Sequence, residues 1–249
     1  VPDRDALPNC IQVDFAIVRG QDGQLTGRVV ELQAFPSLYA LMVVQSDVFL
    51  ERLRKHASGF EAPLSIYFGG RTRDQFVAKL REAVLGGEDP ENVVLLDIAP
   101  ETQKTLPDFA ATEQLTGVRA VCPTRIIKEG RTLLYDRDGK RTPIRRIYNR
   151  VVFDELERAN IPLPFAYDEP LDVSWCSHPN WYWMFSKYTL PHLDHPAIPR
   201  ARTVASFAEI PEDLGGYVLK PLFSFAGAGV KIDPTRADLD AIPDAEREG

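Results

Sequence analysis

Apolar runs alternate with helical segments along residues 64–121, and this alternation limits the possible folds more than any other feature. Thr72 and Gln75 have the spacing of a helix capping box, and apolar side chains at helical spacing follow as far as Gly86. A second helical segment covers Phe109–Leu115. Three apolar runs have the length and composition of strands: Leu64–Phe68, Val93–Asp97 and Arg119–Val121. Strands separated by helices predict an open α/β unit with a parallel sheet.

Turn residues and periodicity predict the elements outside this unit. Residues 11–33 are typical of two strands joined by a turn at Gln21–Gln24. The further expected elements are helices at Leu38–Val44, Val48–His56, Val152–Ala159 and Trp181–Leu190, a hairpin turn at Asp136–Gly139 and a strand at Ile144–Tyr148. Domain seams are expected near residues 57–63 and 175–200.

Charge and composition narrow the functional classes. The 249 residues contain 29 Lys and Arg against 36 Asp and Glu, a net charge of −7, which argues against nucleic acid as the main partner. No apolar run approaches the ~20 residues of a membrane-spanning helix, and three separated cysteines (Cys10, Cys122, Cys176) favour a cytoplasmic location. The chain starts at Val1 rather than Met and stops at Gly249, so we expect a piece, or the ordered part, of a longer protein.

The segment Tyr217–Val230 is a candidate phosphate-binding loop. A β-type run ends at Lys220, a loop of small residues follows, and a second apolar run begins at Val230. The loop residues of interest are Ala226, Gly227, Ala228 and Gly229. Free backbone N–H groups beside a lysine suit phosphate oxygens. Because the lysine precedes the glycines, the segment is not a P-loop and suggests a different way of holding ATP.

The hairpin at residues 11–33 carries a candidate metal site. Glu31 and Gln33 are two residues apart on one strand and so face the same side, and Asp14 on the partner strand can join them. Carboxylate and amide oxygens suit Mg²⁺ beside nucleotide phosphates. The alternative is that the three are ordinary polar side chains on a solvated face.

Two further basic residues are candidates for binding anions. Lys187 follows an unusually aromatic segment, Trp181–Ser186, and either binds phosphate with Lys220 or extends from a core helix towards water. Arg150 ends an apolar strand, where open α/β sheets place ligand-binding groups, and its guanidinium can hold a carboxylate or a phosphate. The alternative for Arg150 is a solvated edge strand.

Other chemistries are weakly indicated. A zinc site would use Cys176, His178, His192 and His195, but their spacing matches no common zinc motif. A nucleophile elbow is absent, and Gly69-Gly70 lacks the remainder of a dinucleotide-binding fingerprint. A Rossmann-like enzyme that uses residues 64–121 therefore remains a weaker alternative.

Taken in order, these motifs resemble the circularly permuted ATP-grasp ligases, the group of glutathionylspermidine synthases and eukaryotic-type glutathione synthetase. Val13-Asp14-Phe15 and Val30-Glu31-Leu32-Gln33 resemble the metal-binding pair of that family, and Ile147–Arg150 its substrate-binding strand end. The family's ATP-binding run is resembled by Ser186-Lys187, Ile198–Thr203 and Val218–Pro221 with Gly227 and Gly229. The resemblance implies an ATP-grasp-like fold, circularly permuted, with an inserted open parallel α/β substrate domain. The implied domains are a metal-binding hairpin with helices (residues 1–60), the open α/β domain (61–175) and the ATP-binding part (176–249).

The resemblance implies an ATP- and Mg²⁺-dependent carboxylate–amine ligase that acts on a small acid and a small amine through an acyl phosphate. Lys187, Lys220 and the loop at 226–229 would bind ATP, and the Asp14–Glu31–Gln33 hairpin would hold Mg²⁺. Arg150 would act on the acid's carboxylate, with Ser37 as a further substrate contact. Ser224 stands where the family has a metal-binding glutamate, and the family's adenine hinge would follow Gly249. Ser224 and a glycine loop (residues 226–229) that is leaner than the family's usual run favour the alternative, a non-catalytic module that binds nucleotide or peptide.

Overall fold

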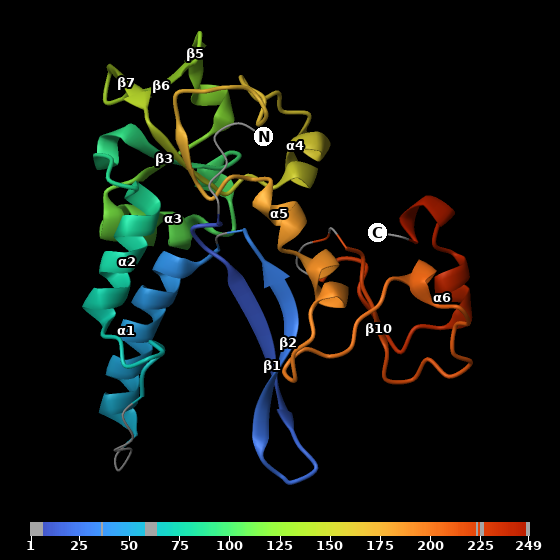
Figure 1. Ribbon diagram of the computed structural model, residues 1–249. Coiled ribbons are helices and arrows are strands. Elements are labelled where there is room, and N and C mark those ends of the chain that lie inside the picture. Colours follow the sequence, from blue (N-terminus) through green and yellow to red (C-terminus); the bar gives the residue numbers. More distant parts are fainter. Residues whose placement is uncertain (1–6, 36, 58–63, 223, 225–226, 248–249) are drawn as a thin grey trace. The chain divides into compact units, whose positions relative to one another are not determined.

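The computed structural model describes residues 7–35, 37–57, 64–222, 224 and 227–247, and it has a mixed α/β fold with parallel and antiparallel sheets (Figure 1). The chain forms two compact units. Unit 1 comprises Val1–Cys10 and Phe35–Pro179, and unit 2 comprises Ile11–Ala34 and Asn180–Gly249. The boundary at 179/180 falls within the seam expected at 175–200. The other boundaries fall at 10/11 and 34/35 rather than near 57–63, since the helix after the hairpin belongs to unit 1.

A four-stranded parallel sheet organises unit 1. Its strand order is β4-β3-β8-β9, and each neighbouring pair is parallel, which confirms the open parallel α/β unit. Strand β3 therefore has β4 on one side and β8 on the other, so the chain reverses its direction of winding at β3/β8. The strands are β3 (Val93–Leu96), β4 (Arg119–Val121), β8 (Arg146–Asn149) and β9 (Ser174–Cys176).

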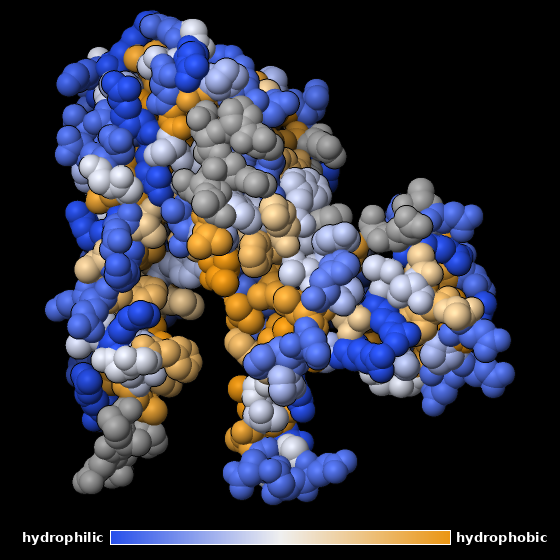
Figure 2. All heavy atoms as spheres, viewed as in Figure 1, coloured by the Kyte–Doolittle hydropathy of each residue, from blue (hydrophilic) through white to orange (hydrophobic). Residues whose placement is uncertain are grey.

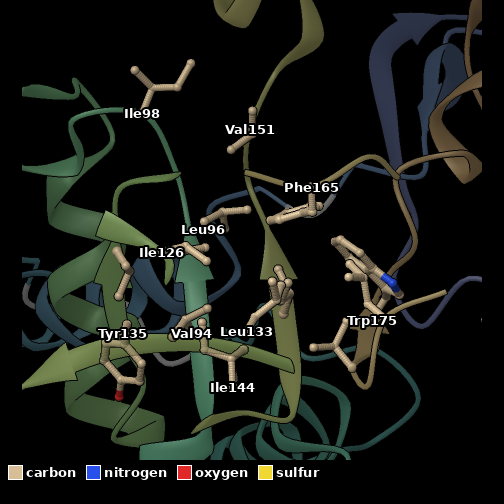
Figure 3. Close-up of a cluster of buried hydrophobic side chains, with 14 residues drawn as sticks. Val94, Leu96, Ile98, Ile126, Leu133, Tyr135, Ile144, Val151, Phe165 and Trp175 are labelled. Atoms are coloured by element: carbon tan, nitrogen blue, oxygen red, sulfur yellow. The ribbon is translucent and has the colours of Figure 1, made fainter. Parts of the chain in front are cut away.

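Both faces of this sheet are buried, which explains why β3 is apolar at every position. Val94 and Leu96 point into one cluster with Ile144, Phe165 and Trp175, and Figure 3 shows these side chains packed over one face of β3 and β8. Their neighbours Val93 and Leu95 pack on the opposite face with residues of α1, α2 and α3.

Three helices line the second face. They are α1 (Tyr39–His56), α2 (Arg73–Leu85) and α3 (Leu106–Thr116). The capping box predicted at Thr72 and Gln75 is confirmed, and α2 ends at Gly86 as expected. The two short helices predicted over 38–56 are wrong: α1 is continuous, because its mid-helix Ser46 is buried in packing instead of ending the helix.

The strand predicted at Leu64–Phe68 is also wrong. This segment has no strand conformation, and the side chain of Phe68 is 90% exposed. A short apolar run becomes a strand only when a neighbouring strand satisfies its backbone, and this segment pairs with no strand in the described part of the chain.

A three-stranded antiparallel sheet follows β4 in unit 1. It consists of β5 (Ile127–Glu129), β6 (Thr132–Arg137) and β7 (Lys140–Ile144), and its β6–β7 turn confirms the hairpin expected at Asp136–Gly139. The single strand predicted at Ile144–Tyr148 is divided at Arg145 between β7 and β8. Helix α4 (Phe153–Ala159) lies where a helix was predicted.

Unit 2 contains two small antiparallel hairpins. The first is β1 (Gln12–Arg19) with β2 (Leu25–Gln33), as predicted, and the second is β10 (Val218–Leu219) with β11 (Lys231–Ile232). Val29, Leu32 and Leu190 form the buried cluster of this unit. Towards its turn the first hairpin is lined by exposed apolar side chains, visible as orange spheres along β1 and β2 in Figure 2.

Short helices connect the strands of both units. The continuous helix predicted at Trp181–Leu190 is instead α5 (Trp181–Met184) followed by a separate 3₁₀ turn. The remaining helices are α6 (Arg236–Asp240) and the 3₁₀ turns η1 (Pro90–Asn92), η2 (Pro100–Thr102), η3 (Pro123–Arg125), η4 (Lys187–His192), η5 (Val204–Ser206) and η6 (Asp244–Glu246). In the portion of the chain that the structure covers, no helix combines the length and apolar character needed to cross a bilayer.

Candidate functional site

The predicted metal-site residues share one face of the β1–β2 hairpin. Asp14 pairs directly with Glu31, and Gln12 pairs with Gln33. Directly opposite residues of an antiparallel pair lie on the same face, as do residues two apart on one strand. The intervening Leu32 is buried in the apolar cluster on the other face. The expectation that Asp14, Glu31 and Gln33 lie together is confirmed.

A β-bulge in β2 helps to place Lys220 beside this face. The register shifts between Asp14 and Phe15, so that Val30 has no pairing partner on β1. An unpaired bulge residue leaves its backbone groups available to other donors. The Lys220 ammonium donates a hydrogen bond to the Val30 carbonyl oxygen at 2.9 Å. The lysine that follows β10 is thereby brought next to Glu31.

Lys187 joins the same cluster from the start of η4. Its Nζ lies 2.9 Å from Glu31 Oε1, and its side chain is only 4% exposed. The ammonium also donates to the Ser224 carbonyl oxygen at 2.5 Å and approaches the Ser224 hydroxyl at 3.4 Å. Lys187 is therefore a buried, paired cation and not a lysine that extends from a core helix into water.

The electrostatics of Lys220 agree with this placement. Burial lowers the pKa of the Lys220 ammonium, the nearby Lys187 cation lowers it further, and the Glu31 carboxylate opposes the shift. Two cations and one carboxylate are thus close enough to influence one another. A partly desolvated pair of lysines attracts phosphate oxygens more strongly than solvated lysines do.

The loop after Lys220 has the backbone freedom that a phosphate cradle requires. Gly227, Ala228 and Gly229 are exposed, whereas Ala226, the fourth predicted loop residue, lies outside the described residues. Gly229 has φ +71°, and a Cβ built on it would lie 2.6 Å from Pro221 Cγ. Only glycine fits this position without moving the loop.

The sequence predicts that this loop binds the phosphates of ATP. On that prediction, we expect Gly229→Ala to reduce MgATP affinity about 10-fold more than Gly227→Ala does, because only at Gly229 does the added Cβ meet Pro221 and displace the loop by Lys220. Gly227→Ala is the matched control: its φ is +74°, but no atom of a described residue lies within 4 Å of its added Cβ. Isothermal titration calorimetry of both variants measures the difference. Equal losses of affinity in the two variants would contradict a specific effect of the Pro221 contact.

The donor set on the hairpin face fits a hard cation such as Mg²⁺. It offers the carboxylates of Asp14 and Glu31 and the side-chain amide of Gln33. The amide nitrogen of Gln12 donates to Asp14 Oδ1 at 3.2 Å, while its Oε1 is buried and has no hydrogen-bond partner within the described ranges. A buried acceptor that lacks a donor is satisfied when a cation or its bound water lies beside it.

The alternative zinc site does not assemble. Cys176 and His178 belong to unit 1, where His178 Nε2 lies 3.1 Å from the Tyr167 carbonyl oxygen, and His192 and His195 belong to unit 2. Among the described residues, no group of three or more His, Cys, Asp and Glu side chains is arranged to hold a metal ion.

The predicted substrate residues lie in unit 1. Arg150 directly follows β8, at the carboxyl edge of the parallel sheet, as predicted. It is 4% exposed, which rules out the solvated edge strand, and it pairs with the buried Asp108. Ser37 precedes the start of α1 and is half-buried.

Sequence reasoning missed Gln12 and Asp108. Gln12 could have been found, since it lies two residues before Asp14 and therefore on the same face of β1. Asp108 gave no signal, because an acidic residue in the first turn of a helix is common and its partner Arg150 is 42 residues away in the chain.

The structure thus brings the predicted metal-site residues, Lys187 and Lys220 together in unit 2, and it places Arg150 in unit 1. No protein-family model matches the sequence, and no curated protein matches it.

Proposed function

We propose that the protein is an ATP- and Mg²⁺-dependent carboxylate–amine ligase of the circularly permuted ATP-grasp type. The observation that carries the proposal is the cluster of Lys187, Lys220 and Glu31 on the bulged hairpin of unit 2, next to an exposed glycine loop. Two lysines beside a carboxylate and a flexible loop suit a polyphosphate with its metal ion. The order of these residues along the chain supports the permuted type.

In this proposal the two lysines bind the phosphates of ATP, and the N–H groups of residues 226–229 cover them. Asp14, Glu31 and Gln33 hold Mg²⁺, which offsets the phosphate charge. Arg150 of unit 1 orients the carboxylate of the acid, and Ser37 contacts the same substrate. A carboxylate oxygen of the acid attacks the γ-phosphorus of ATP, so that ADP leaves and an acyl phosphate forms. The amine then attacks the carbonyl carbon and loses a proton, and inorganic phosphate leaves as the amide bond forms.

The proposal is tested with Lys220→Ala. We expect about 10- to 100-fold weaker MgATP binding, because a charge-assisted contact to phosphate is lost. Lys231→Ala is the matched control, since this second lysine of the β10–β11 hairpin pairs with Asp238. Isothermal titration calorimetry measures both. MgATP affinity that is undiminished in Lys220→Ala, or diminished equally in Lys231→Ala, would refute the nucleotide assignment.

One observation favours the second candidate, a non-catalytic nucleotide- or peptide-binding module. Lys187 already contacts Glu31 and two oxygens of Ser224, so a phosphate must displace one of these partners. Ser224 also offers no carboxylate to a metal ion. Assays of ADP release with candidate acids and amines separate the two: MgATP binding without turnover supports the module, and turnover that depends on both acid and amine supports the ligase.

A further inference from the structure

In the described part of the chain, the guanidinium of Arg150 has a hydrogen-bond partner at Nη1 but none at Nε. Its Nη1 donates to Asp108 Oδ2 at 3.3 Å, and its central carbon lies 5.6 Å from the ring centroid of Phe35 and 5.7 Å from that of Phe109. The Nε–H group is buried and has no hydrogen-bond partner among the residues that the structure describes. A buried donor without an acceptor is costly unless a ligand supplies one. The Nε edge is the side of a guanidinium that binds a carboxylate in a bidentate fork.

The carboxylate that holds Arg150 also caps helix α1. Asp108 is fully buried, and its Oδ1 accepts the backbone N–H of Leu41 at 3.0 Å while its Oδ2 accepts that of Leu38 at 3.2 Å. Helix α1 has no side-chain cap of its own, and its N-cap residue, Leu38, has φ 59°. An acceptor from α3 thus satisfies donors that the first turn of α1 would otherwise leave unpaired.

We propose that Asp108 is a positioning residue that fixes Arg150 and the start of α1 as one subsite for a substrate carboxylate. One side chain with no exposed surface links the strand end that presents Arg150 to the backbone that follows Ser37. The left-handed conformation of Leu38 is strained for a residue with a side chain, and such strain is retained where surrounding contacts enforce it. The role of Arg150 rests on the proposed function, whereas the Asp108 contacts do not.

The subsite has a defined ligand chemistry. Asp108 accepts the hydrogen bond from Nη1 of Arg150, and the rings of Phe35 and Phe109 limit the movement of the guanidinium. Among the described residues none accepts a hydrogen bond from Nε, so this edge can bind one further anion. A planar carboxylate matches this edge, whereas the corresponding amide lacks the charge and the second acceptor. We therefore expect a peptide with a free C-terminal carboxylate to bind better than its C-terminal amide.

The test uses triglycine and triglycinamide as probes and the full chain as the protein. Calorimetry compares wild type, Asp108→Asn, Arg150→Met and the double variant, with Asp74→Asn as a control on the exposed surface of α2. We expect wild type and the Asp74→Asn control to prefer triglycine over its amide about 10-fold or more, and Asp108→Asn and Arg150→Met each to lose that preference. The double variant should lose no more triglycine affinity than Arg150→Met alone, because Asp108 acts through Arg150. MgATP affinity should be the same in all five proteins.

Several outcomes would overturn the inference. If the losses of triglycine affinity in the two single variants add in the double variant, Asp108 acts independently of Arg150. If wild type shows no preference for triglycine over triglycinamide, Arg150 serves no carboxylate subsite. A parallel loss of MgATP affinity means that Asp108 is only structural. Failure of wild type to bind MgATP refutes the proposed function instead, and the triglycine comparison still decides the subsite.

A second measurement covers the case in which Asp108→Asn does not fold. Amide hydrogen exchange at Leu38 and Leu41 reports whether the Asp108 carboxylate still accepts their N–H groups. We expect Arg150→Met to speed exchange at both amides several-fold, since the carboxylate loses the partner that orients it. Unchanged exchange would show that Arg150 and the start of α1 are not linked through Asp108.

Discussion

Replacing Arg146 by methionine is expected to lower the free energy of unfolding of unit 1 by about 3 kcal/mol. Arg146 is buried, and its guanidinium donates to the carbonyl oxygens of Val84 at 3.1 Å and Ala83 at 2.9 Å, and to the Ser174 hydroxyl at 3.0 Å. The two carbonyls belong to the last turn of α2, where a cation also meets the favourable end of the helix dipole. Each buried acceptor left without a donor costs about 1–3 kcal/mol.

The local backbone is built around this side chain. Gly86, which ends α2 with φ 58°, leaves the space that the guanidinium fills, since a Cβ there would lie 2.6 Å from Arg146 Cζ. Methionine can occupy part of that space but cannot donate to any of the three oxygens.

Urea denaturation followed by circular dichroism measures the effect of Arg146→Met. The matched control is Arg145→Met, because Arg145 is the adjacent arginine and is exposed. We expect the control to change the unfolding free energy by less than about 0.5 kcal/mol. Equal losses in the two variants would contradict a structural role for the buried guanidinium.

The second large effect concerns Asp97, which follows β3 at the carboxyl edge of the sheet. Burial raises the pKa of Asp97 to about 7, while the Ile98 backbone N–H and the Arg150 cation oppose the shift. The folded protein therefore holds this proton up to about pH 7, whereas the unfolded chain, in which the carboxyl has its ordinary pKa of 3.8, releases it earlier. The stability due to protonated Asp97 is complete below pH 3.8 and is lost as the pH rises towards 7.

Asp97→Asn should abolish this pH dependence. Asparagine is neutral at every pH and retains an oxygen that can accept the Ile98 N–H, which Asp97 Oδ1 now accepts at 2.7 Å. At pH 8 we expect the free energy of unfolding of the variant to exceed that of wild type by about 2–4 kcal/mol, because a change of one pKa unit corresponds to about 1.4 kcal/mol. At pH 4 the two proteins should be nearly equal in stability.

Urea denaturation at intervals between pH 4 and pH 8 checks this prediction. Asp89→Asn is the control, since Asp89 is exposed and its side chain makes no capping hydrogen bond. The prediction fails if the difference in unfolding free energy between Asp97→Asn and wild type is the same at every pH. That result would show that Asp97 is ionised throughout this range in the folded protein.

Local patterns predicted most of the secondary structure because they depend on neighbouring residues. The capping box at Thr72, the buried strand β3 and the hairpin turns of β1–β2 and β6–β7 follow from side-chain periodicity and turn chemistry. The same reasoning failed where a partner decides the outcome. Leu64–Phe68 has strand composition but no strand beside it in the described structure, and α1 continues through Ser46 because that residue is buried.

For the candidate site, a spacing of two residues was sufficient to place Glu31 and Gln33 on one face, because alternation along a strand is a local property. The pairing of Lys187 with Glu31, the Val30 bulge that receives Lys220 and the Asp108–Arg150 pair depended on the folded chain. These contacts join residues that are distant in sequence, and their free energy depends on burial, which strengthens the attraction between charges, and on desolvation, which opposes it. Neither quantity exists until the strands and helices have packed.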